Sequence, residues 1–226
     1  MDFDAHRGTY REEVRRSISL VKADPELVLE VKAELLLSLL RRHVGDPRLL
    51  RVLDVGCGLG LVDRLIHGAV RELHAVDSAA GTVQDAARSG AGARYAVSDA
   101  TALPYAEGTF DAAFAVCVMH HVPPARWQAF MGEMRRVLRP GGLAVVFEHN
   151  PLNPVTRIAV SRCEFDGDAT LLGQGAVVRL ARDAGLAPIE RRSILYFPWR
   201  GALLRYIERP LGFVPLGGQY YVAARR

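Results

Sequence analysis

Three glycines and one acid stand close together in the stretch "VLDVGCGLG", which covers residues 52–60. Gly56, Gly58 and Gly60 occupy alternate positions directly after an apolar run that contains Asp54. Glycine lets a turn take up positive φ angles and lets the backbone approach a ligand closely. The spacing differs from the GxGxxG fingerprint of dinucleotide-binding proteins, whose third glycine comes one position later. The stretch predicts either a nucleotide-type binding turn or a tight turn that needs glycine only for its backbone angles.

Two further acids stand at the ends of later apolar runs. Asp77 closes "ELHAVD", and Asp99 opens the polar stretch after "ARYAVS". A carboxylate at the first position is suited to accept hydrogen bonds from ribose hydroxyls, and one at the second is suited to an adenine amino group. Each acid has a plainer interpretation as a helix cap or a turn residue. Open α/β sheets bind their ligands at the carboxyl ends of the strands, where all three acids are expected.

Three histidines follow the next two apolar runs. His120 and His121 come after "FDAAFAVCVM", and His149 ends "LAVVFEH". A histidine at the mouth of a cleft is suited to act as a general base near neutral pH. We consider all three as catalytic candidates, with His121 and His149 before His120. No metal site is expected, because two adjacent histidines are not expected to face one ion. The alternative is that His149 joins one of them as a ligand.

The polar stretch "EHNPLNPVTRIAVSRCEFDGD" follows directly and is expected to cover a substrate pocket. His149, Asn150, Arg157 and Arg162 are the residues that we expect to bind a hydroxyl-rich or carboxylate-bearing small molecule. The alternative is a loop in which Asn and Pro only set the turns.

The surrounding sequence alternates between strand-like and helix-like segments, which predicts a parallel sheet covered by helices on both faces. Asp24 and Pro25 are expected to begin the first helix as its N-cap and first residue. Strands are expected over residues 51–56, 72–77, 93–100, 110–119, 143–149, 188–198 and 219–226, and further helices over 59–69, 80–90, 125–142 and 173–186.

The composition narrows the classes of function. A chain of 226 residues suits one domain, at roughly 150 residues per domain. A formal net charge of +4 is too mild by itself to indicate nucleic acid. The three cysteines show no metal-site spacing and suit a reduced protein. The start of the chain lacks the apolar core of a signal peptide, and no apolar run approaches the ~20 residues of a membrane span. We expect a cytoplasmic protein that does not contact the membrane.

Residues 50–150 resemble the class I S-adenosylmethionine (SAM)-dependent methyltransferases, in particular the methyltransferase-11 group. "VLDVGCGLG", "AVDSA", "SDATALPYAEGTFD" and "LRPGG" are similar to successive motifs of that family. The resemblance implies a Rossmann-like α/β fold with a seven-stranded, mostly parallel sheet, helices on both faces and an antiparallel last strand. It also implies SAM as the cofactor and S-adenosylhomocysteine as its product. The residues that it places around the cofactor are Asp54, Gly56, Cys57, Gly58, Gly60, Asp77, Ser78, Asp99, Ala100 and Val116, with Leu103 and Pro104 shaping the pocket.

The same resemblance implies one methyltransferase domain over residues 1–226. Residues 1–45 would form a helical lid, 50–150 the SAM-binding core, and 151–226 the acceptor side with the last strands. Tyr10 would lie in the lid, where it would either close over the cofactor and contact the substrate or pack on the surface.

The acceptor is less well defined than the cofactor. Enzymes that methylate base amines carry an Asn/Asp-Pro-Pro-aromatic loop after the fourth strand, where this chain has "VMHHVPP". No cysteine follows a proline, as cytosine C5 methylation requires. We therefore expect O-methylation of a small metabolite or natural-product intermediate by a monomer or homodimer, with nucleic acid disfavoured. Two alternatives stay open: an RNA or protein methyltransferase that uses the arginine-rich C-terminal part, and a SAM-binding scaffold or cyclase that transfers no methyl group.

Overall fold

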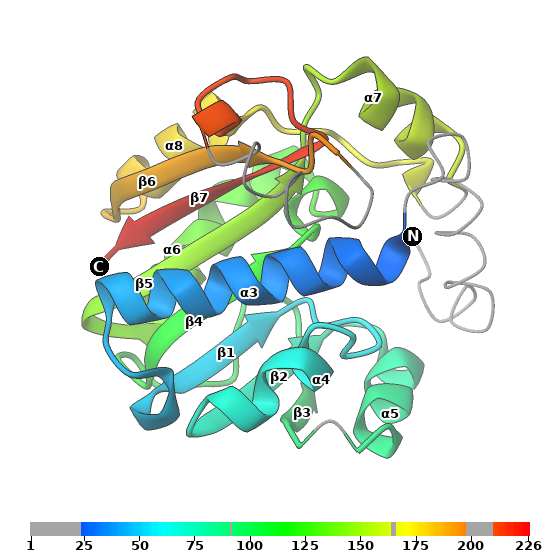
Figure 1. The fold of residues 1–226 in the computed structure, drawn as a ribbon. Coiled ribbons are helices and arrows are strands. Elements are labelled where there is room, and N and C mark those ends of the chain that lie inside the picture. The colour runs from blue at the N-terminus through cyan, green and yellow to red at the C-terminus, as the bar shows by residue number, and fades with distance from the viewer. Residues whose placement is uncertain (1–23, 91, 164–165, 198–209) are drawn as a thin grey trace.

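The computed structural model describes residues 24–90, 92–163, 166–197 and 210–226. Its centre is a seven-stranded sheet of order β3-β2-β1-β4-β5-β7-β6. Only β7 is antiparallel to its neighbours, and its arrow in Figure 1 points opposite to that of β1. This confirms the predicted fold class. The strands are β1 Arg51–Val55, β2 Glu72–Asp77, β3 Arg94–Val97, β4 Phe110–Val116, β5 Leu138–His149, β6 Ala187–Ile194 and β7 Gln219–Arg225.

Helices cover both faces of this sheet, as the near-continuous apolar strands predict (Figure 1). Alternate residues of β1 enter different cores: Val52 packs with α3, and Leu53 packs with α6 and α8. The two cores make β1 and β4 rigid, and their carboxyl ends carry most of the site. The helices are α3 Pro25–His43, α4 Asp63–Ile66, α5 Ala80–Arg88, α6 Trp127–Val137, α7 Pro154–Ser161 and α8 Gln174–Asp183.

Helix α3 begins as the sequence predicts but does not act as a lid. Asp24 caps it, since its Oδ1 accepts a hydrogen bond from the backbone N–H of Glu26 at 3.0 Å. Leu36, Leu39 and Leu40 are fully buried against the sheet, because their spacing places them on one face of the helix. The described part of the expected lid over residues 1–45 is thus a core layer. Residues 1–23, with Tyr10, lie outside the described residues.

Several element boundaries differ from the prediction, and two of the differences have a clear cause. The helix expected over 59–69 is reduced to α4 and a following 3-10 turn at His67–Ala69, because Gly60 takes a positive φ of 65° and still belongs to the turn. The helix expected over 125–142 ends at Val137, and β5 begins at once. The "LRPGG" segment therefore belongs to the start of β5.

Candidate cofactor and acceptor site

The glycine turn connects β1 to α4 at the carboxyl edge of the sheet. Gly56, Gly58 and Gly60 all have positive φ, at 84°, 52° and 65°. A β-carbon on Gly56 would lie 2.5 Å from a methyl group of Val118, whereas one on Gly58 would meet no atom within 4 Å. The turn is closed beneath Gly56 and open at Gly58, so a ligand can approach its backbone there.

Asp77, the last residue of β2, holds this turn. Its Oδ2 accepts a hydrogen bond from the backbone N–H of Gly58 at 2.9 Å, and its Oδ1 accepts one from Ala79 at 3.0 Å. A carboxylate oxygen has more than one lone-pair site, so the half-buried Asp77 can still accept from a ligand hydroxyl. Ser78 lies exposed beside it.

Two buried acids lie behind the turn. Asp54 is 3% exposed, and its Oδ1 accepts no hydrogen bond from the part of the chain that the structure describes. Asp63 is fully buried in α4, and neither of its carboxylate oxygens has such a partner there. Burial raises the pKa of Asp54 well above its usual value, and the charge of Asp63 raises it further. Burial likewise raises the pKa of Asp63 to about 6.

Asp63 was not predicted as a site residue, although an acid between the apolar residues of "GLVDRLI" was a usable signal. Cys57 lies in the same turn, and burial together with the three nearby carboxylates strongly raises the pKa of its thiol. The surroundings of the turn are therefore acidic and suit a ligand that carries positive charge.

Asp99 follows β3 and is exposed. Its Oδ1 accepts hydrogen bonds from the backbone N–H and the hydroxyl of Thr101, both at 2.8 Å, and its Oδ2 lies 2.8 Å from Arg126 Nη2. An adenine amino group would have to share Asp99 with Arg126, so that role stays a prediction. The remaining residues of the expected pocket are Ala100 and Val116, both half-buried, Leu103, which is buried, and Pro104, which is exposed.

On the acceptor side, Glu148 of β5 organises the turn after β4. Its Oε1 accepts hydrogen bonds from the backbone N–H groups of Val118 and Met119, at 3.0 and 2.7 Å. Its Oε2 lies 2.6 Å from His120 Nδ1, and both side chains are almost completely buried. Burial alone would lower the pKa of His120, but Glu148 and Asp166 outweigh it and raise that pKa to about 10.

Asp166 brings the two adjacent histidines together. Its Oδ1 lies 3.2 Å from His121 Nε2 and 3.5 Å from His120 Nε2. The two rings are tilted against each other with their centres 4.1 Å apart. Burial lowers the pKa of His121. The expectation that adjacent histidines do not face one position is wrong here, because the 3-10 turn at Met119–His121 directs both rings toward one carboxylate oxygen.

A second polar group lies at the end of β4. Cys117 has a positive φ of 57°, and its Sγ lies 3.5 Å from Lys32 Nζ and 3.6 Å from Gln219 Nε2. The Gln219 Nε2 atom also lies 3.3 Å from His149 Nδ1. Burial raises the pKa of the Cys117 thiol, but Lys32 and His149 outweigh burial and lower that pKa to about 7.

Lys32, Cys117 and Gln219 were not predicted as site residues. The usable signal was one lysine among the apolar residues of α3, where Lys32 is only 3% exposed. A charged side chain in such a place needs a partner. Its partner comes from β4, more than eighty residues away in the chain.

The structure gives Asn150 a different role from the expected substrate contact. Its side-chain amide donates to the carbonyl oxygens of Pro215 and Gly217, at 3.1 and 2.8 Å, and its Oδ1 accepts from the backbone N–H of Leu152. Asn150 is 3% exposed, so it serves to fix the chain before β7. Arg157 and Arg162 lie exposed on α7 and at its C-cap.

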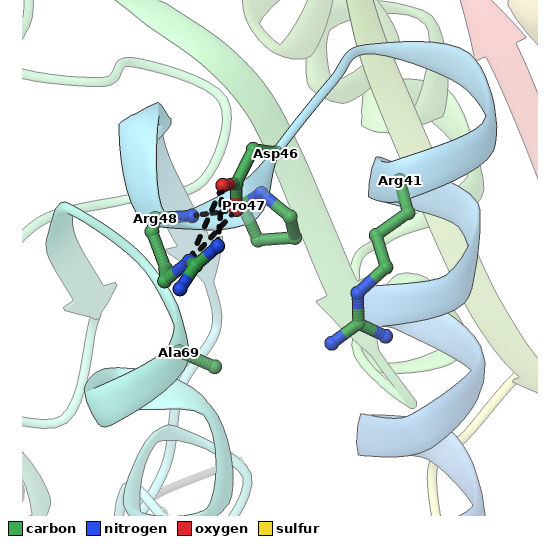
Figure 2. Close-up of a pocket in the computed structure, with 5 residues that line it drawn as sticks. All are labelled: Arg41, Asp46, Pro47, Arg48 and Ala69. Atoms are coloured by element: carbon green, nitrogen blue, oxygen red, sulfur yellow. Dashed lines mark hydrogen bonds and ion pairs between the residues drawn. The ribbon is translucent and has the colours of Figure 1, made fainter.

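A separate pocket lies at the opposite, amino-terminal edge of β1. Figure 2 shows Arg48 bonded to Asp46, and Arg41 extending from α3 toward the same hollow. Because Asp46 and Arg48 already neutralise each other, this pocket offers less for a ligand than the glycine turn does. Its lining residues are Arg41, Asp46, Pro47, Arg48 and Ala69.

The glycine turn fits an aminoacyl nucleoside such as SAM. It is open at Gly58, the carboxylate of Asp77 lies beside it, and a buried oxygen of Asp54 has no hydrogen bond from the described residues. The fold and this turn are those expected of a class I SAM-dependent methyltransferase domain. Residues 53–146 match the family model described as "Methyltransferase domain", so this part of the chain belongs to that family.

Individual relatives agree with this assignment. A demethylmenaquinone methyltransferase from Beutenbergia cavernae is 36% identical over 98 residues, which cover 43% of this chain and 40% of the relative. A malonyl-[acyl-carrier protein] O-methyltransferase from Pseudescherichia vulneris is 34% identical over 114 residues, which cover 49% of this chain and 43% of the relative. The chain thus matches less than half the length of these two curated relatives.

A solved structure extends the similarity to the whole fold. The crystal structure of a SAM-dependent methyltransferase from Thermotoga maritima, described as a possible histamine N-methyltransferase, superposes with a TM-score of 0.69 at 15% identity. The superposition covers 100% of this chain and 99% of the other. Among the helices of the described residues, none is long and apolar enough to cross a membrane.

Proposed function

We propose that this protein binds SAM at the glycine turn and transfers its methyl group to an oxygen atom of a small molecule. The observation that carries the proposal is the turn itself, which is open at Gly58 and surrounded by Asp54, Asp63 and Asp77. SAM carries positive charge on its sulfonium and its ammonium group, and buried carboxylates favour such a ligand. When bound, SAM supplies a methyl group that is already activated for transfer.

The residues around the turn would divide the work of holding the cofactor. The backbone of Gly56–Gly60 and the carboxylate of Asp54 would hold its methionine part, and Asp77 would accept hydrogen bonds from its ribose. Asp99 and Ala100 would lie on the adenine side. This division would leave the carboxyl ends of β4 and β5 for the acceptor. Correct orientation of the acceptor toward the methyl group can lower the activation barrier by up to ~7–11 kcal/mol in favourable cases.

A hydroxyl acceptor must lose a proton as it is methylated, and we assign the base to His149. This histidine is half-buried at the end of β5 and contacts Gln219, whereas His120 and His121 both face Asp166. Replacement of His149 by alanine is expected to lower turnover by ~10²–10⁴-fold, the usual contribution of a general base. The same replacement should leave the affinity for S-adenosylhomocysteine unchanged.

Two features support this acceptor class. One curated relative, named as a malonyl-[acyl-carrier protein] O-methyltransferase, supports oxygen as the acceptor atom. The other, named as a demethylmenaquinone methyltransferase, supports a small-molecule acceptor, but its name does not specify the atom. Arg157 and Arg162 lie exposed on the segment that follows β5, where they would be placed to contact an acidic acceptor.

The test is turnover with methyl-labelled SAM. The protein would be incubated with three classes of acceptor, namely hydroxylated or carboxylated small molecules, tRNA and a protein lysate, and the label would be followed by mass spectrometry. The proposal expects label on an oxygen of a small molecule. Label on tRNA or protein would mean that the acceptor is a macromolecule and not a small molecule. Tight binding of S-adenosylhomocysteine with no transfer to any acceptor would favour a scaffold or cyclase.

A further inference from the structure

We infer that His120, His121 and Asp166 form a binding site for one divalent transition-metal ion of the zinc type. These three residues are called the two-histidine cluster below. The inference goes beyond the proposed function and does not depend on it, because metal binding can be measured without methyl transfer. It also replaces the expectation, drawn from the sequence, that the protein has no metal site.

The geometry of the two-histidine cluster suits such an ion. Each residue offers one ligand atom, and the three atoms all lie within 4.8 Å of one another. Asp166 Oδ1 is 3.2 Å from His121 Nε2 and 3.5 Å from His120 Nε2. Tetrahedral zinc with bonds of about 2.0–2.1 Å requires ligand atoms about 3.3–3.4 Å apart. The two separations from Asp166 bracket that value, and the two histidine nitrogens lie within 4.8 Å of each other, so side-chain movements of about an ångström would close the site around an ion.

Glu148 supplies the outer contact that metal-binding histidines commonly have. A ligating imidazole usually gives its other ring nitrogen to a carboxylate, which fixes the tautomer and the ring orientation. His120 Nδ1 lies 2.6 Å from Glu148 Oε2, which leaves Nε2 facing Asp166. Glu148 is itself held by two backbone N–H groups. This arrangement orients His120 before any ion arrives.

The two-histidine cluster is buried and charged, unlike a chance grouping of polar side chains on the surface. The side chains of His120, His121 and Asp166 are 1%, 12% and 6% exposed, and Glu148 is fully buried. Two buried carboxylates need two positive charges close by. A divalent ion supplies both while the imidazoles stay neutral. The competing arrangement is a protonated His120 held between Glu148 and Asp166, and the experiment below separates the two.

The donor set also selects the kind of ion. Imidazole nitrogen suits zinc, iron, copper and nickel, whereas magnesium and calcium prefer oxygen ligands alone. Three protein ligands leave a coordination position for water or for an oxygen atom of another molecule, as in catalytic zinc sites. The segment that carries Asp166 is fixed to the histidine turn, since the backbone N–H of Thr170 donates to the carbonyl oxygen of His120 at 2.8 Å.

The test is direct metal binding to the full chain after removal of metal by a chelator. Zn²⁺ would be titrated by calorimetry and Co²⁺ by visible absorption, since tetrahedral Co²⁺ gives a characteristic spectrum. We expect one ion per chain. Asp166→Asn and His121→Ala should each weaken Zn²⁺ binding by at least 100-fold, and Glu148→Gln by 10–100-fold. His67→Ala serves as the control, because His67 is exposed after α4 and should leave binding unchanged.

Thermal melts of every variant would show that folding is retained. If His121→Ala does not fold, the Co²⁺ spectrum of the wild type and the Asp166→Asn variant decide the question. The inference is overturned if the wild type binds Zn²⁺ no more tightly than Asp166→Asn, because His120 is then held by its carboxylates alone. If the wild type binds Zn²⁺ but transfers no methyl group to any acceptor, the proposed function is contradicted and the metal site is not.

Discussion

Cys57 and Cys117 lie on the two halves of the same edge of the sheet and have opposite surroundings. Cys57 follows β1 in the glycine turn, where burial and the carboxylates of Asp54, Asp63 and Asp77 raise the pKa of its thiol. Cys117 follows β4, where burial also raises the pKa but Lys32 and His149 lower it to about 7. We call the surroundings of Cys57 the cofactor half and those of Cys117 and His120 the acceptor half, after their proposed roles. The cofactor half is acidic, whereas the acceptor half pairs cations with anions.

The difference shows two ways of building a site. In the cofactor half, backbone angles fixed by glycine surround an acidic space that a cationic ligand would neutralise. In the acceptor half, side chains from the 3-10 turn after β4, from β5 and from the segment around Asp166 neutralise one another. An acceptor would therefore enter a site whose charges are already balanced, and specificity would depend on shape and on exchange of hydrogen bonds.

The largest effect is expected at Gly56. Gly56→Ala places a β-carbon against Val118 in a left-handed backbone conformation, so the turn must shift. We expect the affinity for S-adenosylhomocysteine to fall by more than about 100-fold in calorimetry, since the backbone itself forms the site. Gly132→Ala in α6 is the matched control, because a β-carbon there meets no atom within 4 Å. Equal affinities in both variants would contradict the role of the turn.

A smaller loss of affinity is expected at Asp77. Asp77→Asn removes the charge that accepts from Gly58 and, in our account, from the ribose. Hydrogen bonds to a charged group are worth about 1.5–3 kcal/mol, so affinity for S-adenosylhomocysteine should fall by about 10–100-fold. Asp85→Asn, on the outer side of α5, should change nothing. Unaltered binding in Asp77→Asn would remove Asp77 from the cofactor site.

The acidity of the cofactor half predicts a stability effect at Asp63. The pKa of Asp63 is about 6 in the folded protein, above its ordinary value, so its contribution to stability is present at low pH and is lost as the pH rises through about 6. Asp63→Asn should therefore match the wild type near pH 4. At pH 8 it should raise the free energy of unfolding by on the order of 2 kcal/mol.

Melting temperatures at the two pH values check this prediction. For a chain of this size the gain at pH 8 corresponds to about 4–8 °C. A gain of the same size at pH 4 would point to packing and not to charge as its cause.

The two thiols give the smallest and most specific test. Lys32→Met removes the cation next to Cys117, which should raise the thiol pKa and slow its alkylation by iodoacetamide at pH 7 by about 10-fold. Peptide mass spectrometry identifies the labelled residue. Cys57 should stay unlabelled in both proteins, because its thiol pKa is raised. Equal labelling of Cys57 and Cys117 in the wild type would erase the contrast between the two halves.

The cofactor half was largely predictable from the sequence, and the acceptor half was not. Gly56, Gly58, Gly60 and Asp77 follow predictable strands, and such positions meet at one edge of a parallel sheet. Asp63 was not predicted because a single acid in a short helix has no characteristic spacing. The order of the strands and the antiparallel β7 agree with the resemblance to the methyltransferase family.

The acceptor half depends on contacts between distant segments, which local patterns do not contain. Lys32 meets Cys117 across 85 positions of the chain, and Asp166 reaches back to His121. Asn150 was expected to bind substrate because it is polar and follows a strand. Its side-chain amide instead donates hydrogen bonds to the backbone carbonyl oxygens of Pro215 and Gly217, just before β7. The lid expectation failed in α3 because its leucines are needed in the core.

Hydrogen–deuterium exchange with and without S-adenosylhomocysteine would show whether the ligand binds at the glycine turn. We predict slower exchange over residues 56–60 and 77–80 when the ligand is present, with little change at the pocket around Arg48 shown in Figure 2. Protection confined to the Arg48 pocket, or no protection of the glycine turn at saturating ligand, would contradict the account.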